Sequence, residues 1–434
     1  MRPLLAPPLV LLLALAACAP PPDELYNRGQ QLELEGRYEE AADHYIRALE
    51  REPGMRKAQG RLHVVGGILI GRYLAEAAAA PDPPAAADAY LAAEALIARA
   101  AAVGVVLDQA PPTFDDDLAR ALDDAVEFLI AEGAGHLDAG RFDAALAAFA
   151  QAGRYRPSRE QAEALRVFTF DAHLAWAEAE LAAGRYRAAF DRAGAARPFA
   201  GGDRTPAEVD ALQAEALDRG SVYAAVFPVE EDRGRGTAEA PRGFLDDLDD
   251  LLYDEHWTVP PLFVRTADPI EVRRLLRRHY DPDDRLDHPR LTAELARDLR
   301  AQFGVASTLT RYDRRAEEAD RDSVTVDLRG GGRGTYARVR DRVALRAEAG
   351  YAVVDAAGAR VLCEGEAAAS AEGDVYRGEY DGRVRDLILP SRDRYLFDAA
   401  AQAEAEREVE RRLQGRLADD LARRVYDCLL RQVR

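Results

Sequence analysis

The strongest constraint on the fold of this 434-residue chain is an internal repeat in its amino-terminal half. When Gly36-Arg37-Tyr38 is laid over Gly140-Arg141-Phe142, seven offsets carry the same type of residue. The first copy comprises Gly29, Gly36, Tyr38, Ala41, Tyr45, Ala48 and Pro53, and the second comprises Gly133, Gly140, Phe142, Ala145, Phe149, Ala152 and Pro157. A repeat of this kind predicts stacked supersecondary units.

The recurring residues suit two antiparallel helices that cross closely. Gly29 and Ala41 would let the helix axes approach, Gly36 would supply the turn, and Pro53 cannot continue a helix. The pattern resembles the tetratricopeptide repeat, a helical hairpin of about 34 residues. The resemblance implies a solenoid whose concave face binds peptides or another protein. A spacer or a dimerisation surface is the alternative.

The copies are unevenly spaced along the chain. A third, degenerate copy contains Gly184-Arg185-Tyr186 with Ala189, Ala196 and Pro198, whereas the first two copies lie about three 34-residue periods apart. Residues 54–125 are therefore expected to form further helical hairpins without the consensus. We predict a helical-repeat domain over residues 24–215.

The pattern changes near Gly220 to strands and helices. Expected strands cover 221–229, 262–265, 307–314, 323–328, 335–355 and 359–366, and expected helices cover 244–252, 272–276, 291–303 and 398–431. Gly304 is expected at the carboxyl cap of the 291–303 helix. The last helix carries an apolar stripe that should dock on the sheet, made of Leu413, Leu417, Leu421, Val425 and Leu429. This order predicts an α/β domain with a mixed sheet over residues 220–434.

The order of elements also resembles a periplasmic fold of bacterial envelope lipoproteins. The family includes the curli secretion-channel lipoprotein, activators of penicillin-binding proteins and the amino-terminal domain of the Tol-Pal propeller protein. The resemblance is carried by Ala225-Val226-Phe227-Pro228, Leu262-Phe263-Val264-Arg265, Phe303-Gly304-Val305 and Tyr351-Ala352-Val353-Val354-Asp355. It implies a place in the envelope, but no functional position of that family carries over.

The first eighteen residues read as an export signal. Arg2 precedes an apolar run that is too short for the ~20 residues of a spanning helix, and the run closes on Leu15-Ala16-Ala17-Cys18. This ending resembles the lipobox of bacterial lipoproteins, which implies that Cys18 is lipidated and becomes the mature terminus. An ordinary signal peptide is the alternative. We predict a lipoprotein signal over 1–18 and a linker over 19–23.

The net charge limits which classes of partner the chain can bind, and the cysteines bear on the compartment in which it folds. The formal net charge of −19 repels phosphates, so we expect no nucleic-acid partner. Beyond the inner membrane, Cys363 and Cys428 could form a disulfide. Because Cys428 lies in an apolar helical pattern, a buried free thiol fits equally well.

No motif predicts chemistry. The glycine cluster 330–334 lacks the lysine and following serine or threonine of a phosphate-binding loop, so a hairpin loop is expected. The acidic run 281–284 with Asp287 lacks the glycine and glutamate of an EF-hand, so we expect a solvated loop. We expect no catalytic residue, no metal and no cofactor.

The sequence therefore predicts a lipid-anchored envelope protein that binds rather than catalyses. Its expected partners are unidentified envelope proteins, and its expected location is the periplasmic face of the outer membrane, because Ala19 is not the aspartate that retains enterobacterial lipoproteins at the inner membrane. Two alternatives remain open. One is a subunit of an export or pore assembly, and the other is a cell-wall hydrolase with a cleft between its domains.

Overall fold

The computed structural model describes residues 20–232, 240–279 and 285–433. Contacts within the chain divide it into two units. The first comprises Met1–Glu178 and Arg192–Asp210, and the second comprises Ala179–Asp191 and Ala211–Arg434. The predicted lipidation site Cys18 and the acidic run 281–284 lie outside the described residues.

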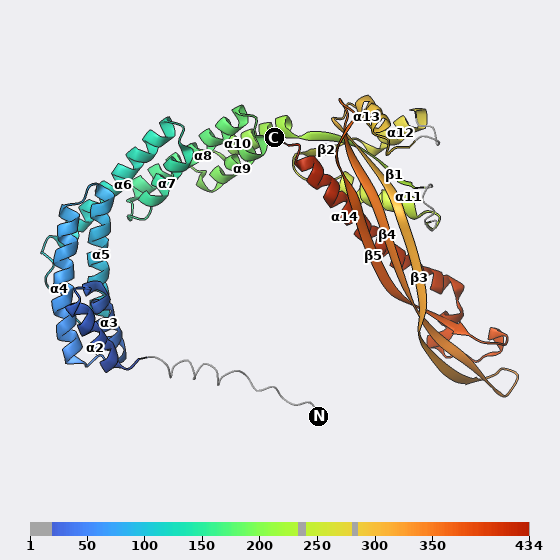
Figure 1. Cartoon of the computed structure of the whole chain (residues 1–434), viewed down its shortest axis with the longest axis horizontal. Helices are drawn as coiled ribbons and strands as arrows, with labels where there is room; N and C mark the ends of the chain where they lie inside the picture. Colours follow the sequence, from blue (N-terminus) through green and yellow to red (C-terminus); the bar gives the residue numbers. More distant parts are fainter. Residues whose placement is uncertain (1–19, 233–239, 280–284, 434) are drawn as a thin grey trace. The chain divides into compact units, whose positions relative to one another are not determined.

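The amino-terminal half is built from helices (Figure 1). Their bounds are α2 Pro22–Leu34, α3 Tyr38–Arg51, α4 Arg56–Ala78, α5 Pro83–Ala102, α6 Phe114–Asp138, α7 Phe142–Ala152, α8 Arg159–Ala182, α9 Tyr186–Ala196, the 3₁₀ turn η2 Arg197–Phe199 and α10 Pro206–Gly220. The expected helices between residues 54 and 125 are present as α4, α5 and the start of α6.

Local chemistry sets where α5 begins. The side chain of Asp82 accepts a hydrogen bond from the backbone nitrogen of Ala85 at 2.9 Å, and Pro83 and Pro84 occupy the first helical positions. Proline costs nothing there, because the first backbone nitrogens of a helix have no intrahelical acceptor. The Asp82-Pro83-Pro84 sequence therefore separates α4 from α5 and starts α5.

The carboxy-terminal half contains a five-stranded mixed sheet of order β2-β1-β3-β4-β5. Its strands are β1 Val222–Glu231, β2 Val264–Thr266, β3 Phe303–Asp327, β4 Arg333–Asp355 and β5 Arg360–Glu379. β1 runs parallel to β2 and β3, whereas β3, β4 and β5 form an antiparallel meander. The predicted fold class is confirmed: helical repeats precede an α/β domain with a mixed sheet and a long final helix.

Helices cover both faces of the sheet near β1. They are α11 Phe244–Leu251, the π-helical turn η3 Leu252–Trp257, α12 Pro269–His279, α13 Pro289–Asp298 and α14 Ala399–Leu430, with 3₁₀ turns at η4 Val384–Asp386 and η5 Ser391–Phe397. Successive β1 residues alternate between two cores: Val226 packs with α11 and α14, and Phe227 packs with α12 and α13. The stripe predicted on the final helix is fully buried, with every member 0% exposed.

Two strand predictions were wrong about length. The segments 307–314 and 323–328 belong to one strand, β3, because the charged residues between them pair with β4 while remaining exposed to solvent. Opposite charges such as Asp322 and Arg338 face each other across this ladder and form an ion pair, and such pairs stabilise a sheet without apolar alternation. The strand expected over 359–366 continues to Glu379, because small residues such as Ala367 and Ala371 pack under α14.

The prediction that Gly304 caps a helix was also wrong. α13 ends at Asp298, and Gly304 lies near the start of β3 beneath α13. A Cβ atom at Gly304 would lie 2.7 Å from Cγ2 of Thr292. The glycine is therefore required by the close approach of α13 to the sheet.

A disulfide joins Cys363 of β5 to Cys428 of α14, with Cα atoms 6.3 Å apart. This pairing settles the two possibilities left open by the sequence. The bond ties the final helix to the outermost strand over a separation of 65 residues.

Within the described residues, no helix is both long and apolar enough to cross a bilayer.

Replacing both Cys363 and Cys428 by alanine should destabilise the second unit by about 3–4 kcal/mol, because the bond no longer restricts the unfolded chain. Urea unfolding would be followed by fluorescence of Trp257, which packs against Tyr426 of α14, in a Trp176→Phe background. Reductant should lower the midpoint of the wild-type chain and leave the alanine variant unchanged. Equal midpoints for the oxidised and reduced wild type would contradict the pairing.

Candidate protein-interaction surface

A glycine and an aromatic ring meet where the helices of each main repeat copy cross. A Cβ atom at Gly29 of α2 would lie 2.6 Å from Cε1 of Tyr45 in α3. The second copy repeats this contact between Gly133 of α6 and Phe149 of α7. Both rings are buried. Only glycine leaves room for the ring at this crossing, so the contact sets how closely the two helices pack.

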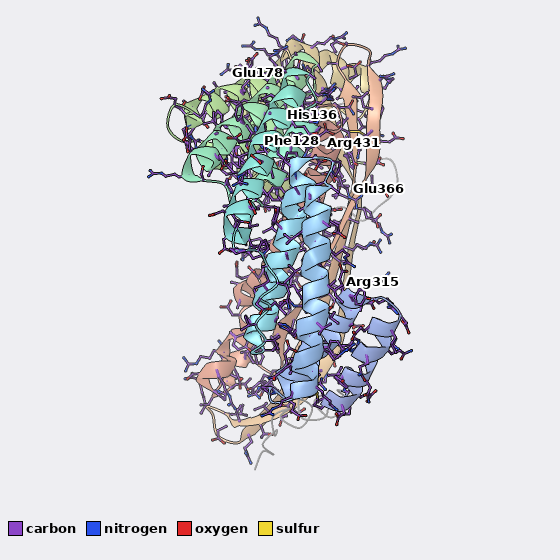
Figure 2. The ribbon with its side chains drawn as sticks, turned by 90° about the vertical axis from the view of Figure 1, so that its left-hand side faces the viewer. Phe128, His136, Glu178, Arg315, Glu366 and Arg431 are labelled. Carbon is purple, nitrogen blue, oxygen red and sulfur yellow. A yellow bond between two sulfur atoms is a disulfide. The ribbon has the colours of Figure 1, made fainter. Side chains whose placement is uncertain are left out.

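The three repeat copies turn in the same way. Gly36, Gly140 and Gly184 have φ angles of +76°, +68° and +74°, which glycine adopts without strain. At the second copy, the backbone nitrogen of Arg141 donates to the oxygen of His136 at 2.8 Å. His136, labelled in Figure 2, lies in the last turn of α6. These turns let α3, α7 and α9 fold back on the preceding helices.

The remaining predicted repeat residues occupy three kinds of place. The alanines at the helix crossings are all 0% exposed, namely Ala41, Ala48, Ala145 and Ala152. Tyr38 and Phe142 are half-buried at the first positions of α3 and α7. Pro53 and Pro157 lie beyond the ends of α3 and α7, where Pro53 is exposed and Pro157 half-buried.

Polar contacts join α2 to α4, the first helix of the next hairpin. Nε of Arg61 donates to Glu33 at 3.0 Å, and the hydroxyl of Tyr45 donates to the same carboxylate at 2.8 Å. Burial, followed by this hydrogen bond, raises the pKa of the Tyr45 hydroxyl above its usual value. Tyr45, whose ring packs on Gly29, therefore also shares Glu33 with Arg61 of the next hairpin.

Sequence reasoning missed Glu33 and Arg61, because their partners are distant in the sequence and belong to no local motif. Lys57, one turn before Arg61, pairs with Asp23 of α2 and lies 4.7 Å from the ring centroid of Tyr26. The basic first turns of α4 are therefore bound to α2.

The outer face of α4 continues from these basic residues into an uncovered apolar surface. Lys57, Arg61, Val64 and Ile68 follow each other at helical spacing, and the side chains of Val64 and Ile68 are 48% and 44% exposed. Gly60, on the same face, has no heavy atom within 4 Å of the position that a Cβ would occupy. We call Gly60, Val64, Ile68 and the similarly open Gly71 the α4 stripe.

An extended segment borders the helix beside this stripe. The side chain of Leu107 is buried against Gly66. A Cβ atom at Gly66 would lie 2.7 Å from Cδ2 of Leu107. Nδ1 of His63 lies 3.0 Å from the backbone oxygen of Val106, whose side chain is 75% exposed. Gly66 therefore makes room for this segment on one side of α4, whereas Gly60 and Gly71 leave the adjoining side without bulky side chains.

The glycine cluster and the possible metal sites considered in the sequence form no binding site in the described residues. The glycine cluster 330–334 turns from β3 into β4, with positive φ angles at Gly331 and Gly332, so the hairpin-loop prediction is confirmed. Among the residues that the structure describes, no group of three or more His, Cys, Asp and Glu side chains could hold a metal ion.

Residues 22–55 match the family model of the tetratricopeptide repeat. The chain carries a tetratricopeptide repeat. No curated protein matches its sequence significantly. Among solved structures, a hypothetical protein CT253 from Chlamydia trachomatis is similar at 14% identity, with a TM-score of 0.23, over 48% of this chain and 98% of that protein. The repeat indicates a role in protein interaction.

Substituting Gly29 by alanine should destabilise the α2–α3 hairpin by about 1–3 kcal/mol, because the methyl group overlaps the ring of Tyr45. The matched control is Gly60→Ala, which adds a methyl group in open space and should stabilise α4 by about 0.5–1 kcal/mol. Hydrogen exchange of the α2 and α3 amides would measure the first effect, and exchange of the α4 amides would measure the second. Equal exchange in the two variants would refute the packing role of Gly29.

Proposed function

We propose that this chain is a lipid-anchored protein of the bacterial envelope that acts as a protein-binding scaffold. The observation that carries the proposal is the α4 stripe beside the matched repeat. The repeat hairpin and α4 share one core, which holds α4 in place while its outer face stays open.

The chemistry of the α4 stripe selects the kind of partner. Val64 and Ile68 are spaced one helical turn apart and flanked by glycines, so they offer a shallow apolar surface without bulky neighbours on the same face. The stripe suits a helix or extended segment of another protein that buries its own apolar side chains there. Arg61 and Lys57 already pair with α2, so we expect apolar contact to dominate binding.

The disulfide supports a location outside the cytoplasm. Disulfides persist in oxidising compartments and are rare in the cytosol. The bond between Cys363 and Cys428 is therefore consistent with the export signal read in residues 1–18. In this proposal the lipid on Cys18 holds the protein at the outer membrane, and its partners are other envelope proteins.

Replacing Val64 and Ile68 together by aspartate should abolish partner binding through the stripe. Crosslinking in cells followed by mass spectrometry would show at least about a tenfold loss of enriched envelope proteins, because charge replaces the apolar contact. The control is Val259→Asp, which changes an exposed valine outside the repeats. An unchanged set of captured proteins in the double variant would refute this binding surface.

Replacing Cys18 by alanine should release the protein from the membrane fraction, since lipid on this one residue would supply the attachment. Fractionation and labelling with a palmitate analogue would measure the two effects separately. Wild-type protein that carries no label, together with unchanged membrane retention of the variant, would exclude the anchor while leaving the binding surface to be judged on its own test.

A further inference from the structure

Among the residues that the structure describes, none pairs with the outer edge of the distal half of β3. On its outer side, β1 pairs with β3 only as far as Leu309, whose oxygen accepts from the backbone nitrogen of Asp232 at 3.0 Å. The next backbone contact on this side is at Asp327, which accepts from Ile388 at 2.9 Å. Between these points β4 pairs with the inner side of β3, and no described segment forms a strand on its outer side (Figure 1). The edge thus presents backbone donors and acceptors that could pair with another strand.

Bulges limit the regular part of this edge. The register between β3 and β4 shifts between Leu309 and Arg311 and again between Glu318 and Asp320. Bulges and charged side chains protect an edge from indiscriminate pairing. Any strand that pairs in regular register must therefore use residues 311–318.

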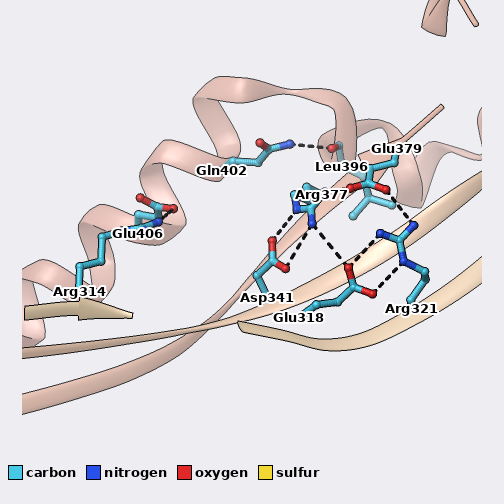
Figure 3. Close-up of polar contacts among 9 residues, drawn as sticks. All are labelled: Arg314, Glu318, Arg321, Asp341, Arg377, Glu379, Leu396, Gln402 and Glu406. Carbon is cyan, nitrogen blue, oxygen red and sulfur yellow. Dashed lines mark hydrogen bonds and ion pairs between the residues drawn. The ribbon is translucent and has the colours of Figure 1, made fainter. Parts of the chain in front are cut away.

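Most charges in this segment already have partners in the chain. Arg314 pairs with Glu406 of α14, and Glu318 lies in a cluster with Arg321 and Arg377 (Figure 3). Arg311 contacts Asp313 and Glu348.

The exceptions are Arg315 and Glu317. In the described part of the chain, neither forms an ion pair, although Arg342 of β4 lies opposite Glu317 in the ladder. These exposed residues have opposite charge, flank Ala316, and project from the same face of the strand.

We propose that a second copy of this chain pairs with the β3 edge in antiparallel orientation, about a twofold axis at Ala316. In this register, Arg315 of each copy lies opposite Glu317 of the other, so the complementary pair forms twice. Arg314 likewise lies opposite Glu318. Opposite charges that face each other across strands stabilise pairing.

The charges select this register over its neighbours. A shift of the axis by one residue would place Arg315 opposite another Arg315, or Glu317 opposite another Glu317, and like charges directly opposite are destabilising. An axis between two residues would bring side chains from opposite faces into register, which a continuous sheet does not allow. A shift by two residues, to an axis at Arg314 or Glu318, would place that charged residue opposite its own copy. The axis at Ala316 is therefore favoured over these neighbouring registers.

Charge reversal tests the proposal on the full chain carrying Cys18→Ala. Sedimentation equilibrium should show a monomer–dimer equilibrium for this parent. Arg315→Glu should weaken dimerisation at least about tenfold, because the symmetric interface contains the altered pair twice. The double variant Arg315→Glu/Glu317→Arg should restore dimerisation to within about threefold of the parent, because the swap re-creates both pairs.

Two results would overturn the proposal: a parent that stays monomeric at every concentration, or a double variant as weak as Arg315→Glu. Both residues are exposed, and thermal unfolding of each variant would verify that the fold is intact.

Crosslinking gives a second, independent measurement. Ala316→Cys in the same background places the two thiols opposite each other at the axis, with Cα atoms about 4.5–5.5 Å apart, within the range of a disulfide. Oxidation should yield covalent dimers. The control Ser323→Cys lies on the same exposed strand but away from the axis, so it should not crosslink. Equal crosslinking of the two variants, or none at Ala316→Cys, would contradict the register.

Discussion

The close contact between a helix glycine and an aromatic ring is the constraint on which the repeat unit depends. Tyr45 occupies the space that a side chain at Gly29 would need, and Phe149 does the same at Gly133. The contact fixes one hairpin, and the hydrogen bond from Tyr45 to Glu33, shared with Arg61, extends it to the next helix. The position and open face of α4 follow from this chain of contacts.

The second unit is organised by the docking of α14 along the sheet. The helix buries a stripe of leucine and valine residues against small side chains of β4 and β5. Gly373 of β5 permits a close approach, since a Cβ there would lie 2.5 Å from Cγ2 of Val409. The disulfide holds the other end of the same interface. The helix packs on one face of the meander, and no described residue pairs with the outer edge of distal β3.

The sequence predicts those parts of the structure that depend on local periodicity. The repeat offsets recur because each hairpin solves the same packing problem, and the final helix shows its buried stripe directly. β3 was divided because its charged middle follows no apolar alternation, although cross-strand charge pairs keep it extended. The α4 stripe and the contacts of Glu33 could not be found in this way, because they depend on which helices become neighbours.

The central claim is that the α4 stripe is where a partner binds, and photocrosslinking in cells tests it most directly. A photoreactive amino acid would replace Ile68 in one strain and Ile270, an exposed residue of α12, in another. The account predicts that irradiation yields a discrete adduct with an envelope protein from position 68 and none from position 270. The same adduct from both positions, or none from position 68, would contradict it.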